Sequence, residues 1–208
     1  MSGRFITVEG IEGVGKTTNI NFIEQLLRDA GKDVVMTREP GGTSLGEDVR
    51  ELLLGHKHDG MSRDAELLLM FAARAEHLDK IILPALENNQ WVLCDRFTDA
   101  TYAYQGGGRG FDIEPISTLE SLVQASLRPE LTLLLDVSVD VGLDRAGKRS
   151  EPDRFEKEKH DFFERVRQTY LERAQADPKR IKVIDASQPL DSVQAQIKET
   201  ITAFLKDK

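Results

Sequence analysis

Short apolar runs alternate with longer segments of helical periodicity along this chain of 208 residues. The runs are apolar on both faces, which is typical of central strands in a parallel sheet covered by helices. They lie at Phe5–Val8, Val34–Met36, Trp91–Cys94, Leu131–Val137 and Ile181–Ile184. Strands that alternate with helices indicate βαβ units, so the pattern predicts an α/β fold with a five-stranded parallel sheet and helices on both of its faces.

The segments between the strands predict six helices. They are expected at Lys16–Ala30, near Leu45–Leu53, across Arg63–Asn88, near Pro115–Ser126, across Lys157–Ala176 and across Leu190–Leu205. Two polar segments depart from this rhythm. Gln105–Gly110 reads QGGGRG and is expected to be a loop, because glycine is costly in a helix. Asp144–Arg154 carries four basic residues, and it is either a solvated surface loop or a mobile lid that brings cations to bound phosphates.

Length and charge limit the classes of protein that fit. A chain of 208 residues predicts one domain with a single core, spanning residues 1–208. The net charge of −8 argues against a nucleic-acid partner, which would need an excess of basic residues. Cys94 is the single cysteine and cannot form an intramolecular disulfide, which favours a reducing compartment. No apolar stretch reaches the length of a membrane helix, so we expect no membrane contact and a cytoplasmic protein.

The segment Gly10–Thr17 reads GIEGVGKT and fits the phosphate-loop spacing G-x-x-x-x-G-K-[ST]. It directly follows an apolar run and opens a helical segment, which is the setting that this motif requires. Its glycines let successive backbone N–H groups point at phosphate oxygens, and the helix adds its positive N-terminal end. Lys16 is expected to reach the β- and γ-phosphates of ATP and the Thr17 hydroxyl to bind Mg²⁺. The alternative, a glycine-rich turn with an exposed lysine, is disfavoured by this setting.

Basic residues recur where other predicted strands end, as a kinase with a second, phosphorylated substrate requires. Arg38 follows one strand, and Asp95 and Arg96 follow another. An arginine fork suits a phosphate monoester because it donates two parallel hydrogen bonds. Asp95 either contributes to the Mg²⁺ shell through water or only orients Arg96. Asp136 also ends an apolar strand, and the sequence does not choose between the two aspartates.

Other classes of phosphate-loop protein fit less well. The N-K-x-D motif expected of a GTPase does not occur in this chain, and the length leaves no room for the extra domains of a motor protein. In the long helical segment, Phe71 and Arg74 share one face. They could stack on a base and read its carbonyl, or they could be a core residue beside a surface arginine. Tyr102, Tyr104 and Gln105 likewise either read a base or pack a helix.

Seven motifs in order resemble the bacterial thymidylate kinase family. They are VEGIEGVGKTT at 8–18, TREPGGT at 37–43, LLLMFAAR at 67–74, CDRF at 94–97, AYQGGGRG at 103–110, DRFE at 153–156 and IDASQPL at 184–190. The resemblance implies a P-loop nucleoside monophosphate kinase fold that uses ATP and Mg²⁺ to convert dTMP to dTDP for dTTP synthesis. It also implies a homodimer and a cis peptide at Glu39–Pro40. The alternatives are a kinase for dUMP or CMP and, less favoured, a nucleotide switch that hydrolyses ATP.

The same resemblance implies roles for individual residues. Catalysis is assigned to Lys16, Arg96, Arg149 and Glu12. ATP is expected at Gly10, Ile11, Glu12, Gly13, Val14, Gly15, Lys16, Thr17 and Thr18, with Arg145 and Arg149. The dTMP is expected at Glu12, Arg38, Phe71, Arg74, Arg96, Thr101, Tyr104 and Gln105, and the metal at Thr17 and Asp95.

Position 12 is acidic and the cations lie in the lid, near 142–156, so the chain resembles the branch whose lid arginines act on ATP, with Arg154 as a further candidate. In that reading Phe71 stacks on thymine, Arg74 hydrogen-bonds its carbonyl, and Glu12 lies near the sugar 3′-hydroxyl. Ala100 stands where the family usually has serine. The spacing from Phe71 to Arg74 is three where some relatives have four, so Met70 is a second candidate for stacking.

Overall fold

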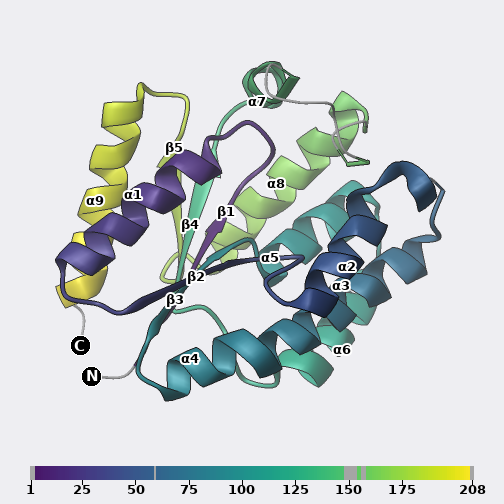
Figure 1. Cartoon of the computed structure of the whole chain (residues 1–208). Helices are drawn as coiled ribbons and strands as arrows, with labels where there is room; N and C mark the ends of the chain where they lie inside the picture. The colour runs from purple at the N-terminus through teal and green to yellow at the C-terminus, as the bar shows by residue number, and fades with distance from the viewer. Residues whose placement is uncertain (1–2, 59, 148–153, 156–157, 207–208) are drawn as a thin grey trace.

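The described residues build one parallel sheet with helices on both sides (Figure 1). The computed structural model describes residues 3–58, 60–147, 154–155 and 158–206. Its strands are β1 (Phe5–Glu9), β2 (Val34–Arg38), β3 (Trp91–Asp95), β4 (Leu131–Asp136) and β5 (Ile181–Asp185). They pair in the order β2-β3-β1-β4-β5, and every pairing is parallel. The predicted five-stranded α/β sheet is therefore confirmed.

The helices form a layer on each face of the sheet. They are α1 (Lys16–Asp29), α2 (Ser44–Leu54), α3 (Arg63–His77), α4 (Leu83–Glu87), α5 (Thr98–Thr101), α6 (Ile113–Gln124), α7 (Val139–Gly147), α8 (His160–Ala176) and α9 (Leu190–Lys206), with a 3₁₀ turn η1 (His56–His58) and two π-helical segments, η2 (Leu78–Ile82) and η3 (Tyr102–Gly108). In Figure 1, α1 and α9 cover one face, while α4, α5 and α8 lie on the other with α2, α3 and α6 beyond them.

The core is thickest around the central strands, because they are covered on both faces. Every residue of β1 is buried, whereas in the edge strand β2 only Val34 is. Ile23 of α1 and Phe163 of α8 are fully buried on opposite sides of the sheet. Burial of a side chain of this size contributes about 1.5–3 kcal/mol. A polar pair inside this core, Thr7 and Thr132, is satisfied by a 2.7 Å hydrogen bond between the two hydroxyls.

The long helix expected across residues 63–88 is present as three consecutive segments rather than one regular helix. The chain passes from α3 through the π-helical η2 into α4, and Pro84 lies at the start of α4. Proline has no N–H and its ring collides with the carbonyl of the preceding turn, so the turn before it widens. The run of apolar residues continues through this change, which is why the pattern predicted one element.

The prediction of a loop at QGGGRG is wrong for most of that segment. Residues through Gly108 belong to the π-helix η3, which packs along α8. A Cβ on Gly107 would lie 2.0 Å from Thr169 Oγ1, and one on Gly108 would lie 2.5 Å from the ring of Phe162. These two glycines are therefore needed for a close approach between helices. Only Gly110, with φ of 70°, uses the left-handed backbone region.

Three other expectations have different outcomes. The peptide bond Glu39–Pro40 is cis, as the resemblance implied. The first part of the expected lid is the end of α7, while residues 148–153 and 156–157 lie outside the described residues, so a single kinase domain with a lid stays a prediction. Within the described residues, none of the helices combines the length and the apolar character needed to span a bilayer.

Candidate active site

A cavity of about 270 Å³ lies at the carboxyl-terminal edge of the sheet. Its walls come from the loop after β1, the ends of β2 and β3, the helices α2 and α3, the segment α5–η3, and Phe155. The lining residues are Gly13, Gly15, Lys16, Thr17, Arg38, Glu39, Pro40, Arg50, Leu54, Met70, Arg74, Asp95, Arg96, Phe97, Ala100, Thr101, Tyr104, Gln105 and Phe155. Ligands of open α/β sheets bind at this edge, so the cavity is the candidate site.

The phosphate loop connects β1 to α1, as the motif predicted. Three of its glycines have positive φ. A Cβ on Gly13 would lie 1.9 Å from the carbonyl oxygen of Gly142, so the loop packs directly on α7. Lys16 Nζ lies 3.4 Å from the carbonyl oxygens of Gly10 and Ile11. Burial and the charge of Arg96 lower the pKa of Lys16. The lysine is thus folded back over the loop.

The other residues expected around ATP differ in what they can offer. The side chains of Ile11 and Val14 are buried in the core, so only their backbone groups can face a phosphate. Thr18 is exposed on α1 and does not line the cavity. Arg145 lies on α7 and donates from Nη1 to the carbonyl oxygen of Ala186 at 3.1 Å. Arg149 lies outside the described residues.

Three guanidinium groups from separate elements form one wall of the cavity. Arg38 ends β2 and Arg96 follows β3, as expected, and Arg50 of α2 joins them. Burial, followed by the charges of Arg38 and Arg96, lowers the pKa of Arg50. Sequence reasoning missed Arg50 because one arginine in an amphipathic helix has the spacing of any surface residue. Three like charges brought together fit a dianionic phosphate.

Glu12 holds Arg96 in this wall. Its Oε1 accepts from Arg96 Nη2 at 2.6 Å, and its Oε2 accepts from the Tyr104 hydroxyl at 2.6 Å. Burial by itself would raise the pKa of Glu12, but the charges of Arg96 and Lys16 outweigh it and the pKa lies below its usual value. Glu12 is not among the lining residues. In this structure the acid acts as the partner of Arg96, and its expected proximity to a sugar hydroxyl stays a prediction.

A second wall carries hydrogen-bonding groups suited to a base. Arg74 Nε donates to Glu39 Oε2 at 2.7 Å, and Arg74 Nη2 donates to Thr101 Oγ1 at 3.0 Å. His77 Nδ1 lies 2.9 Å from the other oxygen of Glu39. Gln105 lines the same wall. Sequence reasoning missed Glu39 and His77, which lie 38 positions apart and have no local pattern that connects them.

Phe71 lies elsewhere than expected. It is 2% exposed and packs with Leu67, Tyr102 and Ile116 in a core cluster, whereas its neighbour Met70 lines the cavity. Adjacent helical residues point about 100° apart, so one of the two faces the cavity and the other the core. Phe71 instead supports Arg74, whose Cζ lies 4.8 Å from the ring centroid. Met70 is thus the apolar side chain of this pair that lines the cavity.

Unpartnered polar atoms gather at this cavity. Among the described residues, four buried side-chain atoms have no hydrogen-bond partner: Asn19 Oδ1, Arg74 Nη1, Asp95 Oδ1 and Arg96 Nε. The last three belong to residues that line the cavity. An unmet buried donor or acceptor costs about 1–3 kcal/mol. Two buried donors and one buried acceptor on residues around one cavity therefore have no partner within the described protein.

The two candidate aspartates have different surroundings. Both oxygens of Asp136 accept from Arg167, at 2.7 and 2.8 Å, and Asp136 does not line the cavity. Asp95 lines the cavity beside Lys16 and Thr17 and keeps Oδ1 unpartnered. Asp136 is therefore engaged in an ion pair outside the cavity, whereas Asp95 lines the cavity with one oxygen that has no partner in the protein.

Comparison with known proteins agrees with this arrangement. The family model described as thymidylate kinase matches residues 8–197. The chain belongs to the thymidylate kinase family.

Individual relatives are similar over the whole length. The chain is 58% identical over 205 residues to a thymidylate kinase of Teredinibacter turnerae, covering 99% of this chain and 100% of the relative. It is 57% identical to one from Pseudomonas putida, with 99% and 98% covered. A crystal structure of thymidylate kinase from Ehrlichia chaffeensis superposes with a TM-score of 0.79 at 37% identity, covering 98% and 100%. The nucleoside monophosphate kinase fold is thereby confirmed.

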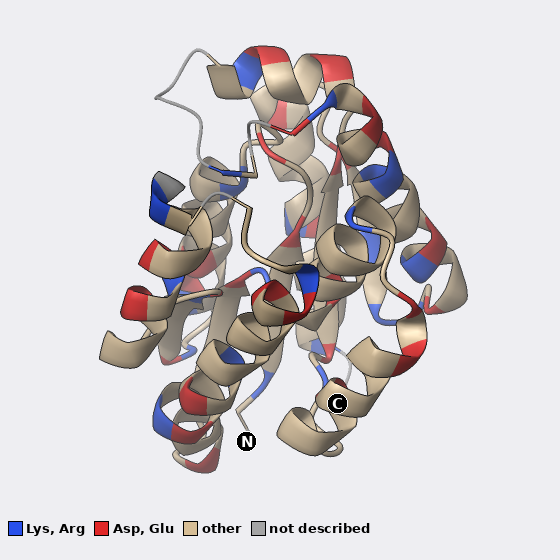
Figure 2. Cartoon of the chain, turned by 90° about the vertical axis from the view of Figure 1, so that its right-hand side faces the viewer, with Lys and Arg blue, Asp and Glu red and all other residues tan. Residues whose placement is uncertain are grey.

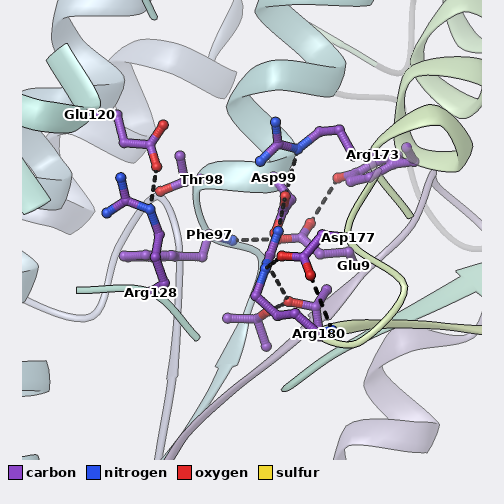
Figure 3. A network of polar contacts seen from close by, with 12 residues as sticks. Glu9, Phe97, Thr98, Asp99, Glu120, Arg128, Arg173, Asp177 and Arg180 are labelled. Carbon is purple, nitrogen blue, oxygen red and sulfur yellow. Dashed lines mark hydrogen bonds and ion pairs between the residues drawn. The ribbon is translucent and has the colours of Figure 1, made fainter. Parts of the chain in front are cut away.

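In this thymidylate kinase family member, a buried carboxyl group lies under the phosphate loop. Glu9 ends β1; its Oε1 accepts from the N–H of Phe97 and its Oε2 from the Tyr170 hydroxyl, both at 2.8 Å. Asp99, clamped by Arg173 and Arg180, lies close to it (Figure 3). Burial and then the charge of Asp99 raise the pKa of Glu9 to about 8. Burial therefore favours the protonated form of Glu9.

The raised pKa of Glu9 predicts that Glu9→Gln changes how stability depends on pH. The folded chain retains a proton that the unfolded chain, with a carboxyl pKa of about 4.5, releases. The contribution of Glu9 to stability thus falls as pH rises from about 4.5 to about 8, by up to about 1.4 kcal/mol per pH unit, and then levels off. Glutamine resembles the protonated form of glutamate. The free energy of unfolding of the variant should therefore rise relative to that of the parent as pH rises. Urea unfolding from pH 5 to 9 measures this, with the half-buried surface residue Glu24, changed in Glu24→Gln, as the control. Parallel curves for the parent and Glu9→Gln would contradict it.

Proposed function

We propose that this chain transfers the γ-phosphoryl group of ATP to dTMP, giving dTDP and ADP in the synthesis of dTTP for DNA replication. The observation that carries the proposal is the convergence of a phosphate loop, three guanidinium groups and three unpartnered polar atoms on one cavity. The loop suits the phosphates of ATP, and the guanidinium groups suit the phosphate of the acceptor.

The base wall supports a thymine acceptor over cytosine. Arg74 Nη1 is an open donor, and Gln105 uses its Nε2 on Glu66, which leaves Oε1 as the acceptor atom. Thymine offers the complementary pair, an O4 acceptor and an N3–H donor, whereas cytosine has an amino donor at position 4 and an acceptor at N3. Met70 and Phe97 provide apolar contact for the 5-methyl group that distinguishes thymine from uracil.

Catalysis in this scheme depends on position and charge. Arg38, Arg50 and Arg96 hold the acceptor phosphate, and Lys16 with the loop amides holds the β- and γ-phosphates of ATP. Glu12 keeps Arg96 in place. Arg145 and Arg149 of the expected lid add charge on the ATP side, opposite the acceptor.

The residues present fit a magnesium ion. The Thr17 hydroxyl and the open Asp95 Oδ1 would hold it, and when bound it neutralises charge on the phosphates. The described part of the chain contains no group of three or more His, Cys, Asp or Glu side chains able to hold a metal. An ion held by one hydroxyl and one carboxylate needs phosphate oxygens and water to complete its shell, as Mg²⁺ commonly does.

The proposal also covers the quaternary state and the location of the protein. Large apolar side chains are exposed on neighbouring helices: Leu68 of α3 and Ile113 and Leu122 of α6 are 56%, 66% and 78% exposed. Such a surface supports a homodimer, and sedimentation equilibrium should give about twice the 23.3 kDa chain mass. A monomer at micromolar concentration would contradict this. Cytoplasmic location is supported by the free Cys94, and cell fractionation would test it.

Lys and Arg positions are mixed with Asp and Glu positions along the helices in the view of Figure 2, rather than gathered on one basic face. This distribution agrees with small nucleotides, rather than nucleic acid, as the partners.

An acceptor panel tests the function directly. With ATP and Mg²⁺, release of ADP should depend on dTMP, should be slower with dUMP by about tenfold, and should be slowest with dCMP. Removal of Mg²⁺ with EDTA should abolish it. A preference for dUMP or dCMP would show that dTMP is not the acceptor. ADP release without any acceptor would favour a nucleotide switch.

Arg50→Gln should weaken the acceptor site selectively. Loss of one charge-assisted hydrogen bond to phosphate costs about 1.5–3 kcal/mol, which predicts a KM for dTMP at least about tenfold higher while the KM for ATP changes little. Steady-state kinetics with each substrate varied would measure this. Arg28→Gln, which removes an exposed i,i+4 partner of Glu24 on α1, is the matched control. An unchanged KM for dTMP would remove Arg50 from the acceptor site.

A further inference from the structure

A buried carboxylate lies behind the base wall without lining the cavity. Glu66, in the first turn of α3, is 1% exposed. Its Oε1 accepts from Gln105 Nε2 at 2.9 Å and from Arg109 Nε at 3.3 Å, and its Oε2 accepts from Arg154 Nη2 at 2.6 Å. Three donors from distant parts of the chain therefore converge on one acidic side chain.

The contacts of the two arginines hold this carboxylate in one position. Arg154 also donates from Nε to the carbonyl oxygen of Leu53 at 2.7 Å, and Arg109 also pairs with Glu158. Both guanidinium groups lie against the ring of Phe155, with Cζ atoms 4.8 and 5.2 Å from its centroid. Arginine has no acceptor atom, so Glu66 can only accept from these partners.

An acceptor-only neighbour determines how the Gln105 amide lies. A glutamine amide has a donor end and an acceptor end of nearly the same shape, and a 180° rotation exchanges them. Only the NH₂ end can bond to the Glu66 carboxylate. The carbonyl Oε1 is then the end that remains for the cavity, which Gln105 lines.

We infer that Glu66 is a positioning residue that determines base specificity by holding the Gln105 carbonyl toward the acceptor base. This inference rests on the proposed function. An outward carbonyl accepts the N3–H of thymine and faces the N3 lone pair of cytosine, so it rejects cytosine by an unpaired, repulsive contact. Arg74 Nη1 makes the same distinction at position 4. By fixing the Gln105 amide, Glu66 makes both groups complementary to thymine.

The test compares dTMP with dCMP in Glu66→Gln. Glutamine at 66 can donate as well as accept, so the Gln105 amide can also rotate by 180° and turn its NH₂ group toward the cavity. The ratio of kcat/KM for dTMP to that for dCMP should then fall by about tenfold or more. Glu120→Gln is the matched control, because Glu120 is also buried and pairs with Arg128 and Tyr102 away from the cavity. Its ratio should equal that of the parent. An unchanged ratio in Glu66→Gln would overturn the inference.

A second pair of variants separates orientation from stability. Glu66→Asp and Glu66→Asn shorten the side chain equally, but only aspartate is acceptor-only, so the fall in selectivity should be smaller in the first than in the second. In a Gln105→Ala background, Glu66→Gln should leave the ratio unchanged. Equal selectivity in Asp and Asn variants, or the same fall without Gln105, would assign Glu66 a structural role only. If the parent enzyme itself does not prefer dTMP to dCMP, the proposed function fails instead.

Discussion

Buried ion pairs between arginine and a carboxylate hold the functional parts of this fold in place. Glu12 holds Arg96, Glu39 holds Arg74, and Asp99 is held by Arg173 and Arg180. A charge buried alone is costly, so each guanidinium taken into the interior needs its counter-charge at a defined position. The acidic partners come from loops and helices distant in the sequence, and they join these elements into one site.

The same pairs leave the atoms that a nucleotide needs. Glu39 and Thr101 occupy two donors of Arg74 but leave Nη1 open, and Glu12 engages Arg96 through Nη2 while Nε has no partner. The groups are therefore oriented before a ligand arrives, which lowers the free-energy cost of ordering them on binding. The inferred role of Glu66 extends this arrangement to a neutral side chain, since a carboxylate also selects which end of an amide faces outward.

Several charged groups are buried close together near the phosphate loop, and their pKa values are shifted as a result. Burial lowers the pKa of Lys16 and of Arg50 and raises the pKa of Glu9. Phosphate oxygens would supply the negative charge that these groups lack. Helix α8 contacts both Glu9 and α5, because its Tyr170 donates to Glu9 and its Arg173 donates to Asp99 (Figure 3).

The sequence alone determined what depends on near neighbours: five strands, the phosphate loop between a strand and a helix, and Arg38 and Arg96 at strand ends. These follow from local periodicity and from parallel strands ending at one edge. Tertiary structure decided what depends on partners far along the chain. Met70 rather than Phe71 faces the cavity because of how α3 is rotated, the residues of QGGGRG up to Gly108 are helical because α8 packs on the glycines, and Asp136 is paired with Arg167 outside the cavity. These outcomes depend on side chains that meet only in the folded chain; for Met70 the spacing to Arg74 gave a second candidate without deciding between it and Phe71.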